Sequence, residues 1–478
     1  MEINRKYNKL VHDTTAFFIS NFASKLLVYI MLPLYTAVLS GAEYGVADAI
    51  STMVNLMSPI LTFAISEAVL RLTFQYTKER NEILTHALAT VLGSTAILAL
   101  CKPLMQLAGA SFINHWLLFI LCYLSYNLQL CFSYYVRAVG KTRLVAVSGV
   151  IQTATLMGCN VLFLLVWEMG LRGYLLALVL GNLMSMLVLF FGSDIVIRLK
   201  KPKWNMVLFR QMMRYSVPMI PTILAWWLNT SINKYIIAFT LGIAARGLFA
   251  IAYKIPSLLT TVASIFTDAW RLSAYDGKDE NPSAFFSPIY HFLNILCICV
   301  CAGLILLSEF MGKILFSNEF FSAWTCVPFL LIAFLFSALC GFLASMFTRE
   351  KKTSKLVVST GVGAAVNLIA SVAMVQSLGI IAGAIATCLS FFATWLVRLA
   401  QSQKICRMEI DYRRSVPSYL CLVIMAAVMT AAVPSRYIVS VILCVIIGAI
   451  NFRDIKNICK VLLGLIKNFL RRKPAGQG

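Results

Sequence analysis

The sequence predicts an all-α integral membrane protein of about fourteen transmembrane helices, with two pseudo-symmetric six-helix bundles followed by two C-terminal helices. Three observations support this fold class. The 478-residue chain is 60% hydrophobic and only 13% charged, whereas soluble domains carry about 25% charged residues. Apolar runs long enough to cross a bilayer recur from end to end. Lysine and arginine gather in alternate connections between these runs.

Fourteen apolar segments are expected to cross the membrane as helices. Because this number is even, both termini are expected on the same side. The approximate ranges of the segments are 14–38, 44–66, 83–101, 115–135, 144–167, 174–197, 216–240, 247–268, 285–308, 322–347, 356–377, 380–400, 416–433 and 437–452.

The distribution of positive charge predicts the orientation. One set of alternate connections holds 33 lysines and arginines, and the other holds 5. The smaller set is Lys102, Arg172, Arg246, Lys313 and Arg436. The positive-inside rule therefore predicts that both termini are cytoplasmic. The formal net charge of +22 is then mostly a topology signal, with attraction to membrane lipid, and nucleic acid is not an expected partner.

The chain divides into four predicted parts. Residues 1–200 and 201–403 are the two bundles, residues 404–453 the two extra helices, and residues 454–478 a basic amphipathic cytoplasmic tail. The bundles are expected to be repeats, because Arg137, Leu144 and Val145 recur at an offset of 212 as Arg349, Leu356 and Val357. Equivalent segments lie six spans apart, so the repeats are parallel and the site is expected between them.

Three lysines lie inside apolar runs: Lys25, Lys234 and Lys254. A cation in hydrocarbon costs at least about 3 kcal/mol, so such residues usually face a wet cavity with a function. Three cations with few acids nearby predict a cavity for an anion. The alternative for Lys234 and Lys254 is that each extends to the outer interface, because both lie near the outer ends of their spans.

Polar side chains form a stripe on the second helix of each half, at steps of three and four residues that keep them on one face. The alternative is that these residues hold helices together. Asp48 and Glu67 are cavity residues, salt-bridge partners of a gate, or interfacial residues. The stripes are Asp48, Thr52, Asn55, Pro59, Thr62 and Ser66, and then Lys254, Ser257, Thr261, Ser264 and Asp268.

Catalytic and metal sites are not predicted. The sequence has no nucleotide-binding loop, carboxylate dyad or nucleophile elbow. The four histidines form no ligand spacing, and the cysteines are interpreted as small apolar residues.

Short motifs in a characteristic order give the chain a family resemblance. The motifs are Glu43-Tyr-Gly45, Glu67-Ala-Val-Leu-Arg71, Arg137-Ala-Val-Gly-Lys141, Tyr215-Ser-Val-Pro218 and Gly379-Ile-Ile-Ala-Gly-Ala-Ile-Ala386. With them the chain resembles the polysaccharide-biosynthesis (O-antigen, Wzx-type) flippases of the multidrug/oligosaccharidyl-lipid/polysaccharide exporter superfamily. The resemblance covers nearly the whole chain.

This resemblance implies transport of an undecaprenyl-diphosphate-linked glycan from the inner to the outer leaflet of the bacterial cytoplasmic membrane by alternating access. It implies no cofactor; coupling to a proton or sodium gradient is left open. Polysaccharide polymerase and glycosyltransferases are the implied protein partners. The candidate substrate-binding residues are Lys25, Lys234, Lys254, Arg71, Asn21, Asn55, Thr62, Ser257 and Thr261. The candidate gating or ion-coupling residues are Asp48, Glu67 and Asp268.

Two rival functions stay open. A cation-coupled drug antiporter of the same superfamily would need acids instead of lysines in the first and seventh helices. A membrane oligosaccharide polymerase or ligase would need a sizeable outer loop, and the longest predicted one covers only about residues 309–321.

Overall fold

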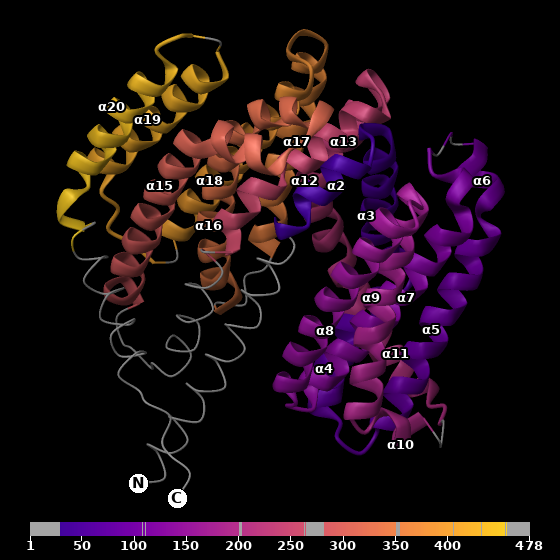
Figure 1. Cartoon of the computed structure of the whole chain (residues 1–478). Helices are drawn as coiled ribbons and strands as arrows, with labels where there is room; N and C mark the ends of the chain where they lie inside the picture. Colours follow the sequence, from indigo (N-terminus) through magenta and orange to yellow (C-terminus); the bar gives the residue numbers. More distant parts are fainter. Residues whose placement is uncertain are drawn as a thin grey trace, which may run out of the picture. The chain divides into compact units, whose positions relative to one another are not determined.

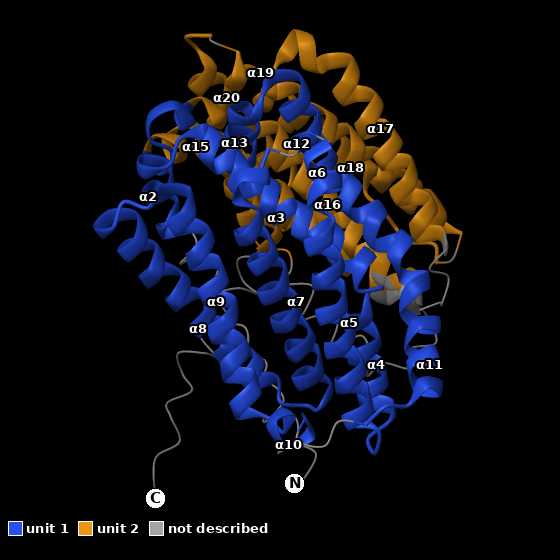
Figure 2. Ribbon diagram, turned by 90° about the vertical axis from the view of Figure 1, so that its right-hand side faces the viewer, with its two compact units in different colours: residues 1–251, 314–321 blue, residues 252–313, 322–478 orange. Residues whose placement is uncertain are grey.

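The computed structural model describes residues 29–199, 203–263 and 282–456, apart from residues 108, 110, 262, 350–353, 405, 432 and 455. The described part consists of helices and their connections (Figure 1). The chain forms two compact units (Figure 2). Unit 1 contains Met1–Ile251 and Ile314–Phe321, and unit 2 contains Ala252–Lys313 and Ser322–Gly478. The boundary between the two units falls within the eighth predicted span. The predicted boundary at residue 200 separates two sequence repeats instead of two sets of contacts, and it stays a prediction.

Unit 1 is a bundle of long helices with short helical pieces between them (Figure 1). Its elements are α2 (Leu32–Val38), α3 (Gly41–Leu61), α4 (Ile65–Gln75), α5 (Arg80–Leu100), α6 (Lys102–Leu107), the 3₁₀ helix η1 (Ile113–His115), α7 (Trp116–Ala138), α8 (Thr142–Asn160), the π-helix η2 (Val161–Val166), α9 (Gly170–Gly192), α10 (Ile195–Leu199), α11 (Met206–Ser216), the 3₁₀ helix η3 (Val217–Met219) and α12 (Ile220–Leu241). The next helix, α13 (Ile243–Ala252), ends at the boundary between the units.

Unit 2 contains the remaining long helices. They are α15 (Pro282–Leu315, whose last residues belong to unit 1), the 3₁₀ helix η4 (Asn318–Cys326, which begins in unit 1), α16 (Val327–Arg349), α17 (Ser354–Leu378), α18 (Ile380–Gln403), α19 (Tyr412–Thr430) and α20 (Arg436–Ile450). Within this unit, α18 packs against α16 and α17, and α19 against α16 and α20.

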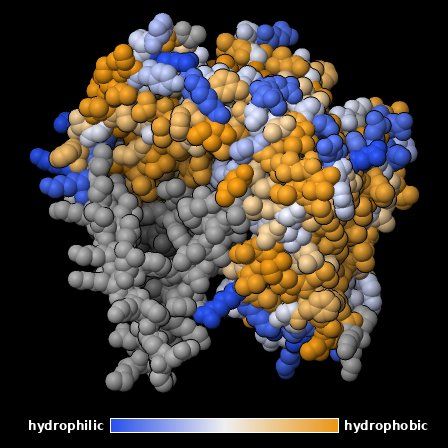
Figure 3. All heavy atoms as spheres, viewed as in Figure 1, coloured by the Kyte–Doolittle hydropathy of each residue, from blue (hydrophilic) through white to orange (hydrophobic). Residues whose placement is uncertain are grey.

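Within the described residues, nine helices are long and apolar enough to cross a membrane, or ten if the bent pair α3 and α4 is one span. The chain is therefore a multi-pass integral membrane protein. On the face shown in Figure 3, apolar side chains cover the middle of unit 1 and hydrophilic ones gather toward its ends. The count of fourteen stays a prediction, because most of segment 14–38 lies outside the described residues and α12, α19 and α20 are not among the nine.

Two arginines that the charge count assigned to connections are buried within helices instead. Arg246 is in the first turn of α13 and is 1% exposed, and Arg398 is in α18 and is 4% exposed. Arg398 donates hydrogen bonds to Ser359 Oγ, Thr360 Oγ1 and the Cys340 carbonyl. Both were misplaced because an arginine near the end of an apolar run reads as a loop residue. Without them the predicted asymmetry is 32 to 4 and the predicted orientation is unchanged.

The second predicted span is broken. Its start is fixed by a capping box, in which Ser40 Oγ accepts from the Glu43 N–H at 3.2 Å and Glu43 Oε2 accepts from the Ser40 N–H at 3.0 Å. Pro59 supplies no N–H near its end, and Phe63 and Ala64 take left-handed conformations with φ of 54° and 51°. Helices α3 and α4 consequently meet at a bend of 56°.

Glycines let α3 and α13 cross closely. A Cβ on Gly247 would overlap the Gly41 carbonyl oxygen and lie 2.9 Å from the Gly45 nitrogen, and a Cβ on Gly45 would overlap the Ile243 carbonyl. Small residues permit such backbone approach between membrane helices.

Candidate functional site

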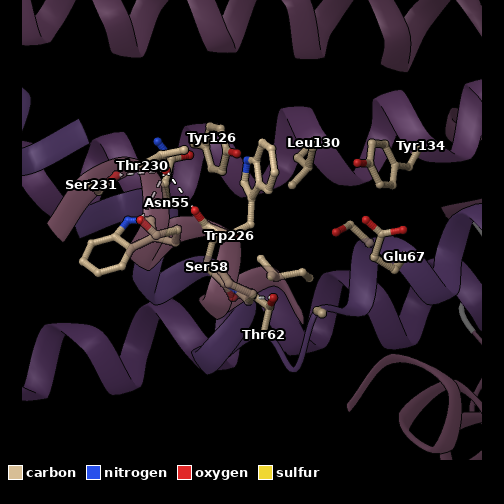
Figure 4. A pocket seen from close by; sticks show the side chains of 15 residues that line it. Asn55, Ser58, Thr62, Glu67, Tyr126, Leu130, Tyr134, Trp226, Thr230 and Ser231 are labelled. Carbon is tan, nitrogen blue, oxygen red and sulfur yellow. Dashed lines mark hydrogen bonds between the residues drawn. The ribbon is translucent and has the colours of Figure 1, made fainter. Parts of the chain in front are cut away.

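A polar pocket of about 350 Å³ lies in unit 1, where the broken second span faces α7 and α12 (Figure 4). Irregular backbone at membrane depth is tolerated where it is buried in protein or lines a cavity. The break at Thr62–Ala64 fits this rule, because residues on both sides of it line the pocket. The lining residues are Asn55, Ser58, Pro59, Thr62, Ala64, Ser66 and Glu67 from the second span, Tyr126, Leu130 and Tyr134 from α7, and Ile223, Trp226, Trp227, Thr230 and Ser231 from α12.

The hydroxyl groups of the lining are oriented by bonds within the protein. Ser58 Oγ donates to Asn127 Oδ1 at 2.6 Å, Thr62 Oγ1 to the Ser58 carbonyl at 2.6 Å, and Thr230 Oγ1 to the Trp226 carbonyl at 3.1 Å. A hydroxyl has one proton and two lone pairs, so each of these groups is left with acceptor capacity for a ligand.

Two indoles of α12 form an aromatic part of the lining. Trp226 is 43% exposed and extends toward Tyr126 and Leu130 of α7 (Figure 4). Trp227 is held in place because its Nε1 donates to the Thr52 carbonyl at 3.0 Å and its ring lies 5.5 Å from that of Tyr235. The pocket thus combines an accessible ring with polar groups, as small-molecule sites commonly do.

Glu67 supplies a carboxylate to the pocket from the first turn of α4. Tyr134 lies beside it (Figure 4), and Tyr134 and Arg137 of α7 are its electrostatic neighbours. Arg137 is exposed, and its guanidinium lies 5.6 Å from the Tyr134 ring. Glu67 is therefore a partly balanced negative charge.

An ion cluster lies at Asp48 of α3, nearer to the start of this helix than the residues that line the pocket. Asp48 Oδ1 accepts from Lys234 Nζ at 2.7 Å, and Asp48 Oδ2 accepts from Arg246 Nε at 3.1 Å. The side chains of Asp48 and Lys234 are each 13% exposed and that of Arg246 is 2% exposed. The Arg246 guanidinium lies 4.3 Å from the ring centroid of Tyr235. The three charges sum to +1.

Thr52 connects the cluster with the pocket. Its hydroxyl accepts from Arg246 Nη2 and lies 3.2 Å from the Tyr235 hydroxyl. Its carbonyl accepts the Trp227 N–H that positions one wall of the pocket. A movement of α13 that displaced Arg246 would therefore reach the lining of the pocket through Thr52.

The structure brings together only some of the predicted site residues. Asn55, Thr62 and Glu67 line one pocket, together with Pro59 and Ser66 of the predicted stripe. Asp48 is a salt-bridge partner, which was one of the three alternatives for it. Lys234 is paired with Asp48 in this conformation, so it is not the lone cation that the sequence predicted; its role in substrate binding stays a prediction.

The other predicted residues lie elsewhere. Arg71 of α4 is exposed, and its guanidinium is 4.5 Å from the ring centroid of Tyr215. In unit 2, Ser257 Oγ donates to the Lys254 carbonyl at 2.7 Å and Thr261 Oγ1 to the Ser257 carbonyl at 3.0 Å. Three predicted residues lie outside the described residues: Asn21, Lys25 and Asp268.

Sequence reasoning missed Trp226, Trp227 and Arg246. Thr230 lies one turn after Trp226 on the same face, so adjacency to a polar position was an available signal for the indole. For Arg246 there was none, because its partner Asp48 is 198 residues away. Among the described residues, no group of histidine, cysteine, aspartate and glutamate is placed to hold a metal ion.

One family model matches more than half of the chain. A family model described as "Polysaccharide biosynthesis protein" matches residues 10–270. No curated protein sequence matches the chain.

Solved structures share the fold at low sequence identity. A lipid II flippase, MurJ, in an inward closed conformation superposes with a TM-score of 0.72 at 15% identity, covering 92% of this chain and 99% of that chain. An inward-facing multidrug resistance MATE family transporter of the MOP superfamily gives 0.66 at 13% identity, covering 80% and 94%. A MATE protein in complex with MaL6 gives 0.61 at 13% identity, covering 83% and 95%.

Proposed function

Because the chain belongs to the polysaccharide biosynthesis protein family and has the fold of a MOP-superfamily transporter, we propose that it is a flippase for lipid-linked oligosaccharide. It moves an undecaprenyl-diphosphate-linked glycan from the inner to the outer leaflet of the bacterial cytoplasmic membrane by alternating access, with both termini cytoplasmic. The family match over residues 10–270 is the observation that carries this proposal.

The chemistry of the pocket supports a hydrophilic cargo. Its lining has six serine, threonine and asparagine side chains inside a bundle of apolar helices. Polar groups in such a place cost free energy unless they bond to each other, to water or to a cargo. The lipid tail of the carrier stays in the bilayer, so only the glycan and the diphosphate enter the protein.

The diphosphate requires cations. Buried ammonium and guanidinium groups form strong, charge-assisted bonds with phosphate oxygens where water is scarce. We assign this task to Lys25 and Lys254, with Arg71 and Lys234 at other stages of the cycle. Polysaccharide polymerase and glycosyltransferases would act on either side of this step.

A bacterial strain that depends on this chain for its surface polysaccharide provides the test. Lys25→Ala is expected to abolish surface polysaccharide while the lipid-linked intermediate accumulates in the inner leaflet and the protein remains inserted. Normal export from this variant would refute the role of Lys25. Normal export from a strain without the chain would refute the proposed function.

A cation antiporter is the second candidate, and the pocket gives a specific reason for it. Glu67 beside Tyr134, in a pocket that is also lined by Trp226, has the chemistry of a site for an organic cation. Uptake of ethidium into proteoliposomes driven by an ion gradient, without translocation of lipid-linked sugar, would favour it.

A further inference from the structure

The pocket differs in charge from a phosphate site. Among the described residues that line it, Glu67 supplies the one carboxylate, and there is no lysine, arginine or histidine. A diphosphate that entered this pocket would lose water of hydration and would lie near the Glu67 carboxylate, which is also negatively charged. The two halves of the proposed cargo, glycan and diphosphate, are therefore expected to be held in different places.

The hydrogen-bonding capacity of the lining points in the same direction. The hydroxyl groups of Ser58, Thr62 and Thr230 each donate a hydrogen bond to a protein oxygen. The Asn55 amide uses one N–H on the Ser51 carbonyl at 3.0 Å and retains its carbonyl oxygen. These four side chains therefore present acceptor oxygens to the pocket, which suits a ligand with O–H and N–H donors.

The aromatic wall adds an apolar surface beside these acceptors. Trp226 exposes 43% of its surface, and Trp227 is fixed by its bond to the Thr52 carbonyl. A pyranose ring has an apolar C–H face and a rim of hydroxyl groups, so it can pack on an indole while it donates to the acceptors around it.

Resting on the flippase function proposed above, we propose that this pocket is a subsite for a neutral or amino-bearing sugar residue of the glycan. Trp226 packs against the ring of that sugar, and the Glu67 carboxylate excludes hexuronic acids. Arg137 moderates this selectivity without cancelling it, because Arg137 is exposed and does not line the pocket, whereas Glu67 does.

Two synthetic lipids test the proposal with the full chain in proteoliposomes. Both are polyprenyl diphosphates; one carries a single N-acetylhexosamine and the other a single hexuronic acid. Translocation is measured as accessibility of the sugar to membrane-impermeant periodate. We expect the neutral probe to move at least about tenfold faster, because juxtaposing like charges costs more than about 1.4 kcal/mol.

Variants separate the charge of Glu67 from its shape. Glu67→Gln is expected to reduce the ratio of rates to below about threefold, since the repulsion is lost while the size is kept. Glu67→Asp keeps the carboxylate and preserves the ratio. Glu79→Gln removes a carboxylate outside the pocket and is the matched control, with the ratio unchanged.

A tryptophan pair tests the packing surface separately. Trp226→Leu is expected to slow the neutral probe by about tenfold, comparable to the loss of one good aromatic contact. Trp204→Leu, which removes a 68% exposed indole outside the pocket, is expected to leave the rate unchanged.

The outcomes distinguish the subsite from the function. If the wild-type chain moves neither probe, the flippase function is wrong. If it moves both at equal rates, or if Glu67→Gln keeps the full ratio, the flippase function stands and the sugar subsite is overturned. Competition of ethidium with the neutral probe, abolished by Glu67→Gln, would assign the pocket to organic cations instead.

Discussion

At the residue scale, Asp48 is the anion that lets two cations lie together within the bundle. Lys234 and Arg246 both bond to its carboxylate, and neither side chain is more than 13% exposed. Removing one partner of a buried ionic group leaves uncompensated charge, which commonly costs more than the whole group contributes.

Asp48→Asn is therefore expected to destabilise the protein by about 3 kcal/mol, measured as a lowered Tm of the purified protein in detergent. Asp194→Asn is the comparison: its partner Arg198 is 3.0 Å away, the two side chains are 26% and 31% exposed, and Asp194 also accepts from the Tyr135 hydroxyl at 3.2 Å. Because this pair is more accessible to water, a smaller loss is expected than for Asp48→Asn. Equal losses in the two variants would show that Asp48 is solvated and does not hold the cluster.

Individual site residues were predictable where a local pattern marks them. Steps of three and four residues identified Asn55 and Thr62, which line the pocket. The pairing of Asp48 with Arg246 was not predictable, because no local pattern joins residues 198 positions apart. The lysines were identified by their cost in hydrocarbon, yet that argument does not say which carboxylate neutralises Lys234.

At the scale of elements, the crossing of α3 and α13 depends on backbone contact. Gly45 and Gly247 leave no room for side chains at this crossing, where a Cβ on Gly247 would overlap the Gly41 carbonyl oxygen. The ion cluster lies beside it, since Asp48 follows Gly45 on α3 and Arg246 immediately precedes Gly247 on α13. A tight crossing next to a charged cluster is a suitable place for a contact that forms in one conformation and opens in another.

Gly247→Ala is expected to disrupt this crossing, because the added Cβ would overlap the Gly41 carbonyl oxygen. We expect a lower Tm and slower translocation of lipid-linked sugar. Gly303→Ala is the control: a Cβ there meets nothing within 4 Å, and alanine stabilises a helix by about 1 kcal/mol relative to glycine. Full activity and an unchanged Tm for Gly247→Ala would mean that the helices are not in contact at Gly247.

The break between α3 and α4 shows what element prediction could and could not provide. A proline such as Pro59 favours a kink in a helix, and the second span does bend there. The left-handed conformations at Phe63 and Ala64 were not predictable, because these residue types rarely adopt them. Surrounding packing imposes this conformation, and the pocket lies on the resulting bend.

At the scale of the whole molecule, composition and the length of the apolar runs predicted the all-helical membrane class and most helix positions. The division into units was not predictable in the same way. The similarity between the two sequence repeats predicts a bundle boundary at residue 200. The contacts in the structure place α12 and most of α13 in unit 1. The helices that join two repeats can pack with either one, and sequence similarity does not decide which.

The polar pocket gives the last prediction, which concerns access from water to the interior of the molecule. In a variant whose 14 cysteines are replaced, Asn55→Cys is expected to react with a membrane-impermeant maleimide, because Asn55 is exposed in a polar pocket. Leu92→Cys, on the lipid-facing side expected for α5, is the control. Leu92 is 56% exposed in the protein but should be covered by lipid, where a charged reagent does not reach it.

Lipid-linked oligosaccharide should slow the labelling of Asn55→Cys, since the glycan would occupy the pocket. Reaction of Asn55→Cys without any protection by the cargo would indicate a water-filled space that the glycan does not enter. If Asn55→Cys were as unreactive as Leu92→Cys, the polar stripe of the second span would hold helices together. The transport path would then have to be sought elsewhere in the chain.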